Sequence, residues 1–361
     1  MSSASTMVLS SQFLNSPQFK LILLTGMVLQ NSCTVLVGRY TRSSVPTEEL
    51  YVVNHLIVIT EIGKLLLSCG FEYATTNGQL AKSIQTNIID RPYDALKIMV
   101  PALLYLVQNS LLYVALSNLT APIFQVTYQA KLVTTAIVSV MMLNRKYSPQ
   151  QWICLVIISV GVAIVVLGET GDSKKVSDAS GKQSLTVGLM AVTIACLSSA
   201  LAGVYFEKVV KAVGAEKQAP VSVWMRNIQL AFFTICTAVF QGLWQKAKSD
   251  TAQPYLHGFT GYVWVLVGLQ AGGGLLVAAV IKYADNVLKG LATGVSVCFA
   301  TACSTILFGT PLSGQFSVGA TMILTSVYFF SNPMKSKQPS PVQQSPSSGN
   351  SAEMRSILPR Q

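Results

Sequence analysis

Apolar residues in this chain gather into ten blocks of roughly 20 residues each. A helix of about 20 residues crosses a hydrocarbon core about 30 Å thick, so each block is long enough to span a bilayer. Apolar character is continuous within the blocks, which favours helices over the alternating pattern of a membrane β-barrel. The sequence therefore predicts an all-α, polytopic membrane protein. The ten predicted transmembrane spans are 19–38, 50–72, 97–117, 122–143, 150–168, 185–206, 221–243, 261–281, 288–308 and 314–331.

The composition agrees with a chain that is surrounded by lipid. Hydrophobic residues make up 51% of the chain and charged residues 11%, with a mean hydropathy of +0.51. Soluble domains carry about 25% charged residues, so a soluble globular domain and a disordered chain are both excluded. The net charge of +11 reflects only 14 acidic residues against 25 basic ones, and no basic run exceeds two residues. Nucleic acid is therefore not an expected partner.

The distribution of Lys and Arg predicts how the chain lies in the membrane. Of the 25 basic residues, 15 fall on the side that would hold both termini and 7 on the opposite side. The positive-inside rule then predicts that both termini are cytosolic. Residues 1–18 form a cytosolic segment in this interpretation, and the Ser-, Pro- and Gln-rich residues 332–361 form a disordered cytosolic tail.

A polar linker divides the predicted spans into two equal sets. Residues 169–184 are rich in Gly, Asp, Ser and Lys and are predicted to be luminal. They separate a first five-helix repeat, 19–168, from a second one, 185–331. An odd number of spans inverts the second set relative to the first, which is typical of inverted-repeat transporters.

Lys131 and Lys289 are among the lysines that lie within predicted spans, where a charge costs roughly 2.5–3.5 kcal/mol on insertion scales. Lys131 in the fourth span and Lys289 in the ninth are each followed four residues later by a threonine, Thr135 and Thr293. Lys131 has no acid within one turn of its own span, so it either faces an anionic ligand or pairs with an acid from another span. Lys289 follows Asp285 by four residues, which allows an ion pair, and it lies at a helix start, where anions bind. A third interpretation is that Lys289 extends to the membrane interface.

Further polar groups interrupt the second, third and seventh spans. Glu61 and Lys64 are three residues apart and share a helix face. They either form an ion pair that fixes helix packing or act as functional groups. Gln108, Asn109 and Asn227 are amides that either bind a ligand or join helices, at about 1 kcal/mol each. Two cations, several aromatic faces and several amides together match a ligand with a phosphate and a nucleobase.

Four stretches of the chain resemble the nucleotide-sugar transporters of the Golgi, which belong to the drug/metabolite transporter superfamily. They are FQVTYQAKLVTTAIVSVMMLNRK (124–146), AGVYFEKVVK (202–211), VWMRNIQL (223–230) and KYADNVLKG (282–290). The resemblance extends from about residue 20 to 331 and looks closest to the UDP-N-acetylglucosamine and UDP-galactose carriers. It implies ten helices, cytosolic termini and a central cavity between inverted halves.

The resemblance also implies roles for individual residues. Lys131 and Lys289 match lysines that meet the ligand phosphates, and Glu61 and Lys64 match a pair near the sugar. The matches to cavity residues near the nucleoside are Tyr105, Gln108, Asn109, Phe124, Tyr128, Tyr205 and Asn227. Departures from the family pattern occur at Ser110, Phe124 and Ala200, which line or flank the expected cavity.

The main hypothesis is a secondary active antiporter of the Golgi membrane and not an enzyme. It would exchange cytosolic UDP-N-acetylglucosamine or UDP-galactose for luminal UMP by alternating access, without a cofactor or a metal. Its partners would be the nucleotide sugar, the nucleoside monophosphate and the bilayer, and a homodimer is left open. The alternatives are a CMP-sialic acid/CMP exchanger, a carrier of phosphorylated sugars, and an intramembrane phosphotransferase that uses Asp90 and Asp94.

Overall fold

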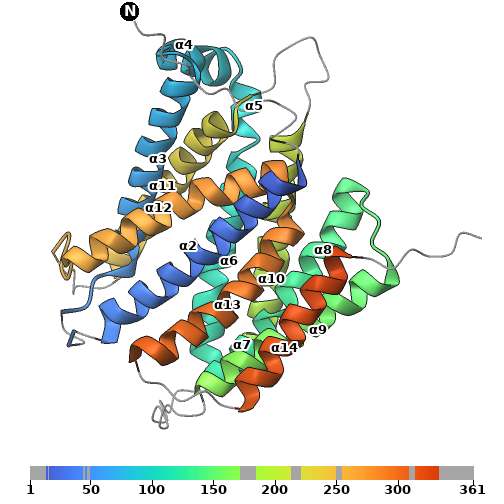
Figure 1. Ribbon diagram of the computed structural model, residues 1–361. Coiled ribbons are helices and arrows are strands. Elements are labelled where there is room, and N and C mark those ends of the chain that lie inside the picture. The colour runs from blue at the N-terminus through green and yellow to red at the C-terminus, as the bar shows by residue number, and fades with distance from the viewer. Residues whose placement is uncertain are drawn as a thin grey trace, which may run out of the picture.

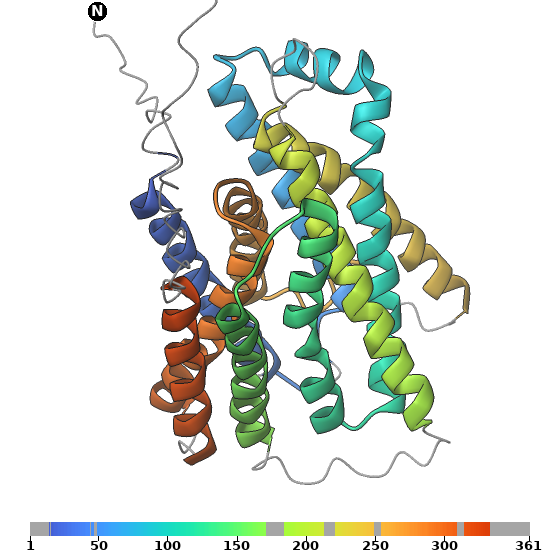
Figure 2. The same ribbon diagram turned by 90° about the vertical axis from the view of Figure 1, so that its right-hand side faces the viewer.

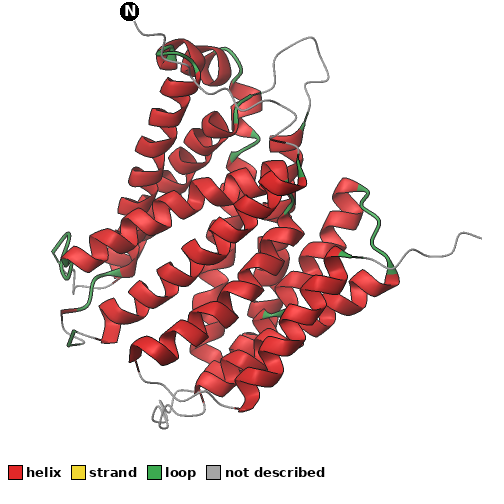
Figure 3. Ribbon diagram, in the orientation of Figure 1, coloured by secondary structure: helices red, strands yellow, loops and turns green. Residues whose placement is uncertain are grey.

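The structure is a computed structural model that describes residues 14, 16–43, 45–46, 49–170, 184–212, 221–248, 254–308 and 314–332. Within these ranges the chain forms helices joined by turns and links, and none of these residues lies in a strand (Figure 3). The helices are α2 (Pro17–Ser43), α3 (Val53–Thr75), α4 (Leu80–Ile84), α5 (Pro92–Leu96), α6 (Met99–Asn118), α7 (Ala121–Tyr128), α8 (Ala130–Leu143), α9 (Pro149–Thr170), α10 (Leu185–Lys211), α11 (Val223–Lys248), α12 (Gly261–Tyr283), α13 (Asn286–Phe308) and α14 (Gly314–Ser331).

Eight segments of the described chain are long and apolar enough to cross a membrane. They are Pro17–Arg42, Pro92–Asn118, Ile123–Leu143, Pro149–Gly168, Leu185–Lys211, Val223–Leu243, Gly261–Tyr283 and Asn286–Leu307. A polytopic helical membrane protein is thus confirmed. The second and tenth predicted spans coincide with α3 and α14, which are not among these eight, so the number ten stays a prediction. Residues 171–183 of the predicted linker and 333–361 of the predicted tail lie outside the described residues, as do residues 1–13.

The long helices pack in a small number of extensive pairs (Figures 1 and 2). α10 lies against both α6 and α8, and α2 lies against both α12 and α13. α3 packs on α11, and α9 packs on α14. Segments far apart in the sequence therefore form the centre of the molecule.

The α9–α14 pair shows how small residues bring two helices together. A Cβ atom on Gly161 would lie 3.0 Å from the carbonyl oxygen of Gly319, and one on Gly319 would lie 2.6 Å from the carbonyl oxygen of Gly161. Such contacts are closer than a larger residue tolerates, so the two glycines allow the backbones to touch. Leu155, Ile158 and Ile323 are fully buried in the apolar cluster beside this contact.

The predicted fourth span is not one continuous helix. α7 ends at Tyr128 and α8 begins at Ala130, with Gln129 between them. Hydrogen bonds of the i→i−3 type tighten the junction, from the Gln129 amide to the Val126 carbonyl (3.2 Å) and from the Leu132 amide to the Gln129 carbonyl (3.3 Å). Neither Gly nor Pro occupies this position, so the usual sequence signals for a break are missing. The break directly precedes Lys131, and interrupted helices are where many transporters place their sites.

Candidate functional site

Lys131 and Lys289 line one cavity of about 230 Å³ between α8, α9, α10 and α13. Lys131 lies one residue into α8, and Lys289 lies in the first turn of α13. Tyr128, at the end of α7, lines the same cavity. The other lining residues are Gln129, Leu132, Thr135, Ile158, Ser159, Val162, Val166, Ser199, Asn286, Gly290, Thr293, Gly294 and Val297.

Neither lysine of this cavity is neutralised by an acidic side chain of the described residues. No carboxylate oxygen there lies within 4.0 Å of either Nζ atom. Lys131 instead donates to the hydroxyl of Tyr128 at 3.3 Å, with its Nζ 5.3 Å from the centre of that ring. Lys131 lines the same cavity as Lys289, and Glu207 accepts a hydrogen bond from the backbone amide of Asn286, three residues before Lys289. Two cations that repel each other in a medium of low dielectric favour a bound anion.

Tyr128 connects the lysines to an aromatic and amide wall. Its hydroxyl also accepts a hydrogen bond from Nε2 of Gln108 at 3.2 Å, and its ring stacks on Phe124 with centroids 5.7 Å apart. A phenol oxygen that accepts from Gln108 and Lys131 still has its own proton to donate. The Tyr128 hydroxyl can therefore donate to an oxygen of a ligand in the cavity.

A second cavity, of about 480 Å³, lies between α3, α6 and α11 and contains two more of the predicted residues, Tyr105 and Asn109. Gln108, 7% exposed, lies on the same helix and reaches Tyr128 in the wall of the first cavity. No charged side chain lines this second cavity. Its polar lining residues are Asn54, Tyr105, Asn109, Tyr113, Thr234, Thr237 and Gln241. Such a lining suits an uncharged ligand group that forms hydrogen bonds.

Glu61 and Lys64 form the ion pair that their spacing allows, with Nζ of Lys64 2.6 Å from Oε2 of Glu61. Both side chains are nearly buried, and neither lines the two cavities. A Cβ on Gly274 of α12 would lie 2.5 Å from Cδ of Lys64, so this glycine leaves the space that the lysine stem occupies. The structure therefore separates this pair from the lysines of the first cavity.

Asn227 and Tyr205 lie away from the lining of both cavities. Asn227 on α11 is 1% exposed, and its Nδ2 has no hydrogen-bond partner among the described residues. Tyr205 on α10 packs with Trp224 and Phe233 against an apolar cluster. Asn227 thus remains a buried amide with a free donor, whereas Tyr205 belongs to a packed aromatic group.

The acids of the predicted phosphotransferase loop form cross-links. Oδ2 of Asp94 lies 2.6 Å from Nη2 of Arg226, which is buried, and Oδ1 lies 3.1 Å from Nζ of Lys97. Asp90 accepts a hydrogen bond from Nε2 of Gln85 at 3.1 Å. The Asp94–Arg226 contact ties the segment before α6 to α11, and the other two contacts are local to that segment, so both acids have a structural use.

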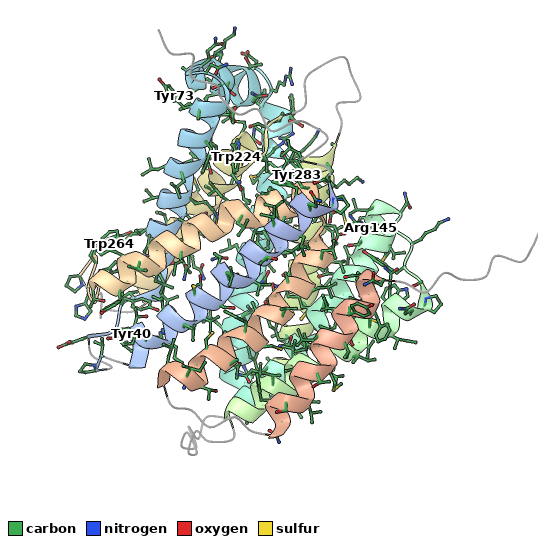
Figure 4. All side chains as sticks on the ribbon, in the orientation of Figure 1. Tyr40, Tyr73, Arg145, Trp224, Trp264 and Tyr283 are labelled. Atoms are coloured by element: carbon green, nitrogen blue, oxygen red, sulfur yellow. The ribbon has the colours of Figure 1, made fainter. Side chains whose placement is uncertain are left out.

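A network of charges lies next to Lys289. Arg145, in the α8–α9 link, contacts Glu207 of α10 at 2.5 Å and Asp285 at 2.7 Å. Lys211 contacts Glu207 at 2.8 Å, and Glu207 is fully buried. Burial alone would lower the pKa of Arg145, but the carboxylates of Asp285 and Glu207 outweigh it and raise that pKa above its ordinary value. Figure 4 shows Arg145 beside the end of α8.

This network corrects two expectations for Lys289. Asp285 pairs with Arg145 and not with Lys289, although the spacing of four allows that pair. The amides at the start of α13 are not free for a ligand, because Asn286 donates to Glu207 at 3.0 Å and Leu288 donates to Asp285 at 2.6 Å. Protein carboxylates occupy the anion site that the helix start offers.

Comparisons with known proteins show the family to which the chain belongs. A family model described as nucleotide-sugar transporter matches residues 15–331. The chain belongs to the nucleotide-sugar transporter family. It is 40% identical to the UDP-galactose translocator of Mus musculus, over 88% of this chain and 79% of the relative. It is 38% identical to the UDP-N-acetylglucosamine transporter of Homo sapiens, over 86% of this chain and 94% of the relative. The family that the four quoted stretches predict is thereby confirmed.

A solved structure shows a similar fold. A crystal structure aligns with a TM-score of 0.62 at 13% identity and covers 88% of this chain and 97% of that chain. At this identity the likeness concerns the fold alone.

The transporter's cavity also contains residues that were not predicted as site residues. Asn286 precedes Lys289 by three residues, as Tyr128 precedes Lys131, and its buried Oδ1 has no partner among the described residues. A Cβ on Gly203 would lie 2.5 Å from Nδ2 of Asn286, so this glycine provides room for the amide. The equal offset of three is the sequence signal that could have identified Asn286.

Proposed function

We propose that this transporter exchanges a cytosolic UDP-sugar, UDP-N-acetylglucosamine or UDP-galactose, for luminal UMP. The observation that carries the proposal is the pair Lys131 and Lys289, which line one cavity without a carboxylate partner among the described residues. The relatives named for UDP-galactose and UDP-N-acetylglucosamine support the choice of sugar. Both UDP-sugars and UMP carry phosphate charge, so one pair of ammonium groups serves the two directions of exchange.

The ligand phosphates lie between the two ammonium groups in this proposal, and the Tyr128 hydroxyl donates to a phosphate oxygen. The uncharged nucleoside occupies the neighbouring cavity beside Tyr105 and Asn109, with Gln108 between the two subsites. The remaining family-implied residues keep their proposed places. Phe124 stacks on Tyr128 beside the lysine cavity and is proposed to lie near the nucleoside. Tyr205 and Asn227 near the nucleoside, and Glu61 and Lys64 near the sugar, are proposed from the family resemblance alone, because these four residues line neither cavity.

Ten transmembrane helices in two inverted halves, residues 19–168 and 185–331, are part of the proposal. The packed helix pairs support this arrangement. When each helix is replaced by its equivalent in the other half, the same set of packed pairs is obtained. The α6–α10 pair corresponds to α12–α2, and the α8–α10 pair corresponds to α13–α2. The α3–α11 and α9–α14 pairs each correspond to themselves. Such pairing is expected when an approximate twofold axis lies in the membrane plane.

Alternating access follows from the two halves rocking about the lysine cavity. The proposed orientation places both termini in the cytosol, with a luminal linker at 169–184 and a cytosolic tail after residue 331. The Golgi membrane is the proposed location, in keeping with the family.

The test is exchange in liposomes that contain the purified full-length protein and are preloaded with UMP. Radiolabelled UDP-galactose and UDP-N-acetylglucosamine should enter UMP-loaded liposomes and should not enter empty ones. Lys131→Ala should abolish most of this uptake. Uptake by Lys131→Ala at the wild-type rate, or uptake that depends on CMP and not on UMP, would contradict the proposal.

A further inference from the structure

Two acids close to Lys289 both contact a single arginine. Asp285 precedes Lys289 by four residues, at the spacing of a helical ion pair. Glu207 accepts a hydrogen bond from the backbone amide of Asn286, three residues before Lys289. Arg145 contacts Glu207 through Nη2 at 2.5 Å and Asp285 through Nη1 at 2.7 Å. One guanidinium, a planar fork with five donors, therefore holds both competitors for the ammonium of Lys289.

We propose that Arg145 is a positioning residue that keeps Lys289 available to the ligand by holding Glu207 and Asp285. The inference rests on the proposed function, because it takes the phosphate to be bound by Lys289. It adds a residue that does not line the cavity and that acts on affinity through another side chain.

A buried charge is stabilised by a nearby charge of opposite sign. Glu207 is fully buried, and a buried carboxylate that loses its cation attracts the nearest remaining one. Lys211 contacts Oε1 of Glu207, and the Asn286 amide donates to Oε2, so Arg145 is one of three groups that hold this acid. Without Arg145, Lys211 is the cation that still contacts Glu207, and Lys289, three residues after the Asn286 amide that bonds this acid, is a further ammonium that it can attract. A phosphate would then have to displace Glu207 from Lys289 before it could bind.

The ion pairs of Arg145 with Glu207 and Asp285 connect the two predicted halves, which has a second consequence. Arg145 belongs to the first predicted half, whereas Glu207, Asp285 and Lys289 belong to the second. The availability of Lys289 therefore depends on a contact between the halves, at the edge of the molecule where Figure 4 shows both Arg145 and Tyr283. Arg145 can then hold the acids only while the two halves are close at this edge.

The experiment measures the affinity of the full-length purified protein for UMP by thermal-shift titration. Arg145→Gln is expected to weaken UMP binding about tenfold. Adding Glu207→Gln to this variant removes the freed acid and should restore the affinity to within about threefold of wild type. Adding Asp285→Asn in its place should restore less, because Asp285 remains bonded to the Leu288 amide.

Recovery by a second substitution separates this role from simple damage to the fold, since a damaged fold does not regain affinity when another charge is removed. Arg145→Lys provides a milder variant that should fold even if Arg145→Gln does not. A single ammonium holds the two acids less well, so its affinity for UMP should fall about threefold. Wild-type affinity in both Arg145 variants, or no recovery in either double variant, would overturn the inference.

The same titration of Lys289→Ala distinguishes this inference from the proposed function. If Lys289→Ala binds UMP as tightly as wild type, the phosphate role of Lys289 is wrong. If Lys289→Ala binds weakly while the Arg145 variants bind normally, only the role of Arg145 is wrong.

Discussion

The two cavity lysines have opposite kinds of surroundings. Lys131 follows a break between α7 and α8, and its neighbours are the hydroxyl and the ring of Tyr128. Lys289 lies in the first turn of an uninterrupted α13, beside the ion-pair network of Arg145 and Glu207. Both are followed four residues later by a threonine, which donates to the carbonyl oxygen of its own lysine.

The difference shows that a half-buried ammonium can be kept free of carboxylates in two ways. In the first half, the Lys131 ammonium contacts the hydroxyl and the ring of Tyr128, and no acid of the described chain lies within 4.0 Å of it. In the second half, acids are close to Lys289 but are already bound to other cations. We therefore expect the positive charge of Lys289 to depend more strongly than that of Lys131 on neutralisation by a bound ligand.

Lys289→Ala should have the largest effect on ligand binding. The cavity loses a cation that has only a ligand to neutralise it, so the affinity for UMP should fall about 100-fold, or about 2.7 kcal/mol. Titration of the purified variant measures this loss. Lys289→Arg is the matched control, because it keeps the charge, and it should retain more affinity than Lys289→Ala.

Lys131→Ala should have a smaller effect than Lys289→Ala. Tyr128 remains in place and still donates to the ligand, so we expect a fall of about 30-fold, or about 2 kcal/mol. The same titration measures it. An effect of Lys131→Ala that exceeds that of Lys289→Ala would reverse the comparison.

Replacing Lys64, which forms an ion pair with Glu61, should change the stability of the folded protein. Lys64→Met leaves Glu61 uncompensated and nearly buried, which should lower the free energy of unfolding by about 1.5 kcal/mol. Thermal denaturation without ligand measures the change as a lower Tm. The double variant Glu61→Gln/Lys64→Met should recover most of the loss. Lys289→Met should not lower the ligand-free Tm, because it removes a charge that lacks a partner.

Tyr128→Phe should have the smallest effect of the four. It removes the hydroxyl that contacts Lys131 and Gln108 but keeps the stacking on Phe124. The loss of about one hydrogen bond should weaken UMP binding about fivefold. Uptake assays at several UMP concentrations measure it as a higher KM. An unchanged KM would mean that the hydroxyl does not reach the ligand.

Much of the fold follows from local sequence because a membrane span must be long, apolar and helical. The blocks at 185–206 and 261–281 correspond to α10 and α12 within a few residues. The break at Gln129 could not be predicted in this way, since no Gly or Pro marks it. The i→i−3 hydrogen bonds that accompany the break appear only in the folded structure.

The site was predictable where the relevant residues are close in sequence and less so elsewhere. Lys131 and Tyr128 are one turn apart, and the lack of an acid within one turn of Lys131 is what pointed to a ligand or a distant acid as its partner. The spacing of four allowed an Asp285–Lys289 pair as one interpretation, but Asp285 pairs with Arg145, which lies on a distant part of the chain. Local spacing identifies only the ion pairs that a helix allows, whereas tertiary structure decides which of them form.

A structure of the transporter with UMP bound tests the central claim most directly. The account predicts that the phosphate lies in the cavity between α8 and α13, with its oxygens about 2.7–2.9 Å from Nζ of both Lys131 and Lys289. A phosphate bound outside that cavity, or a Lys289 ammonium bonded to Glu207 while UMP is present, would contradict it.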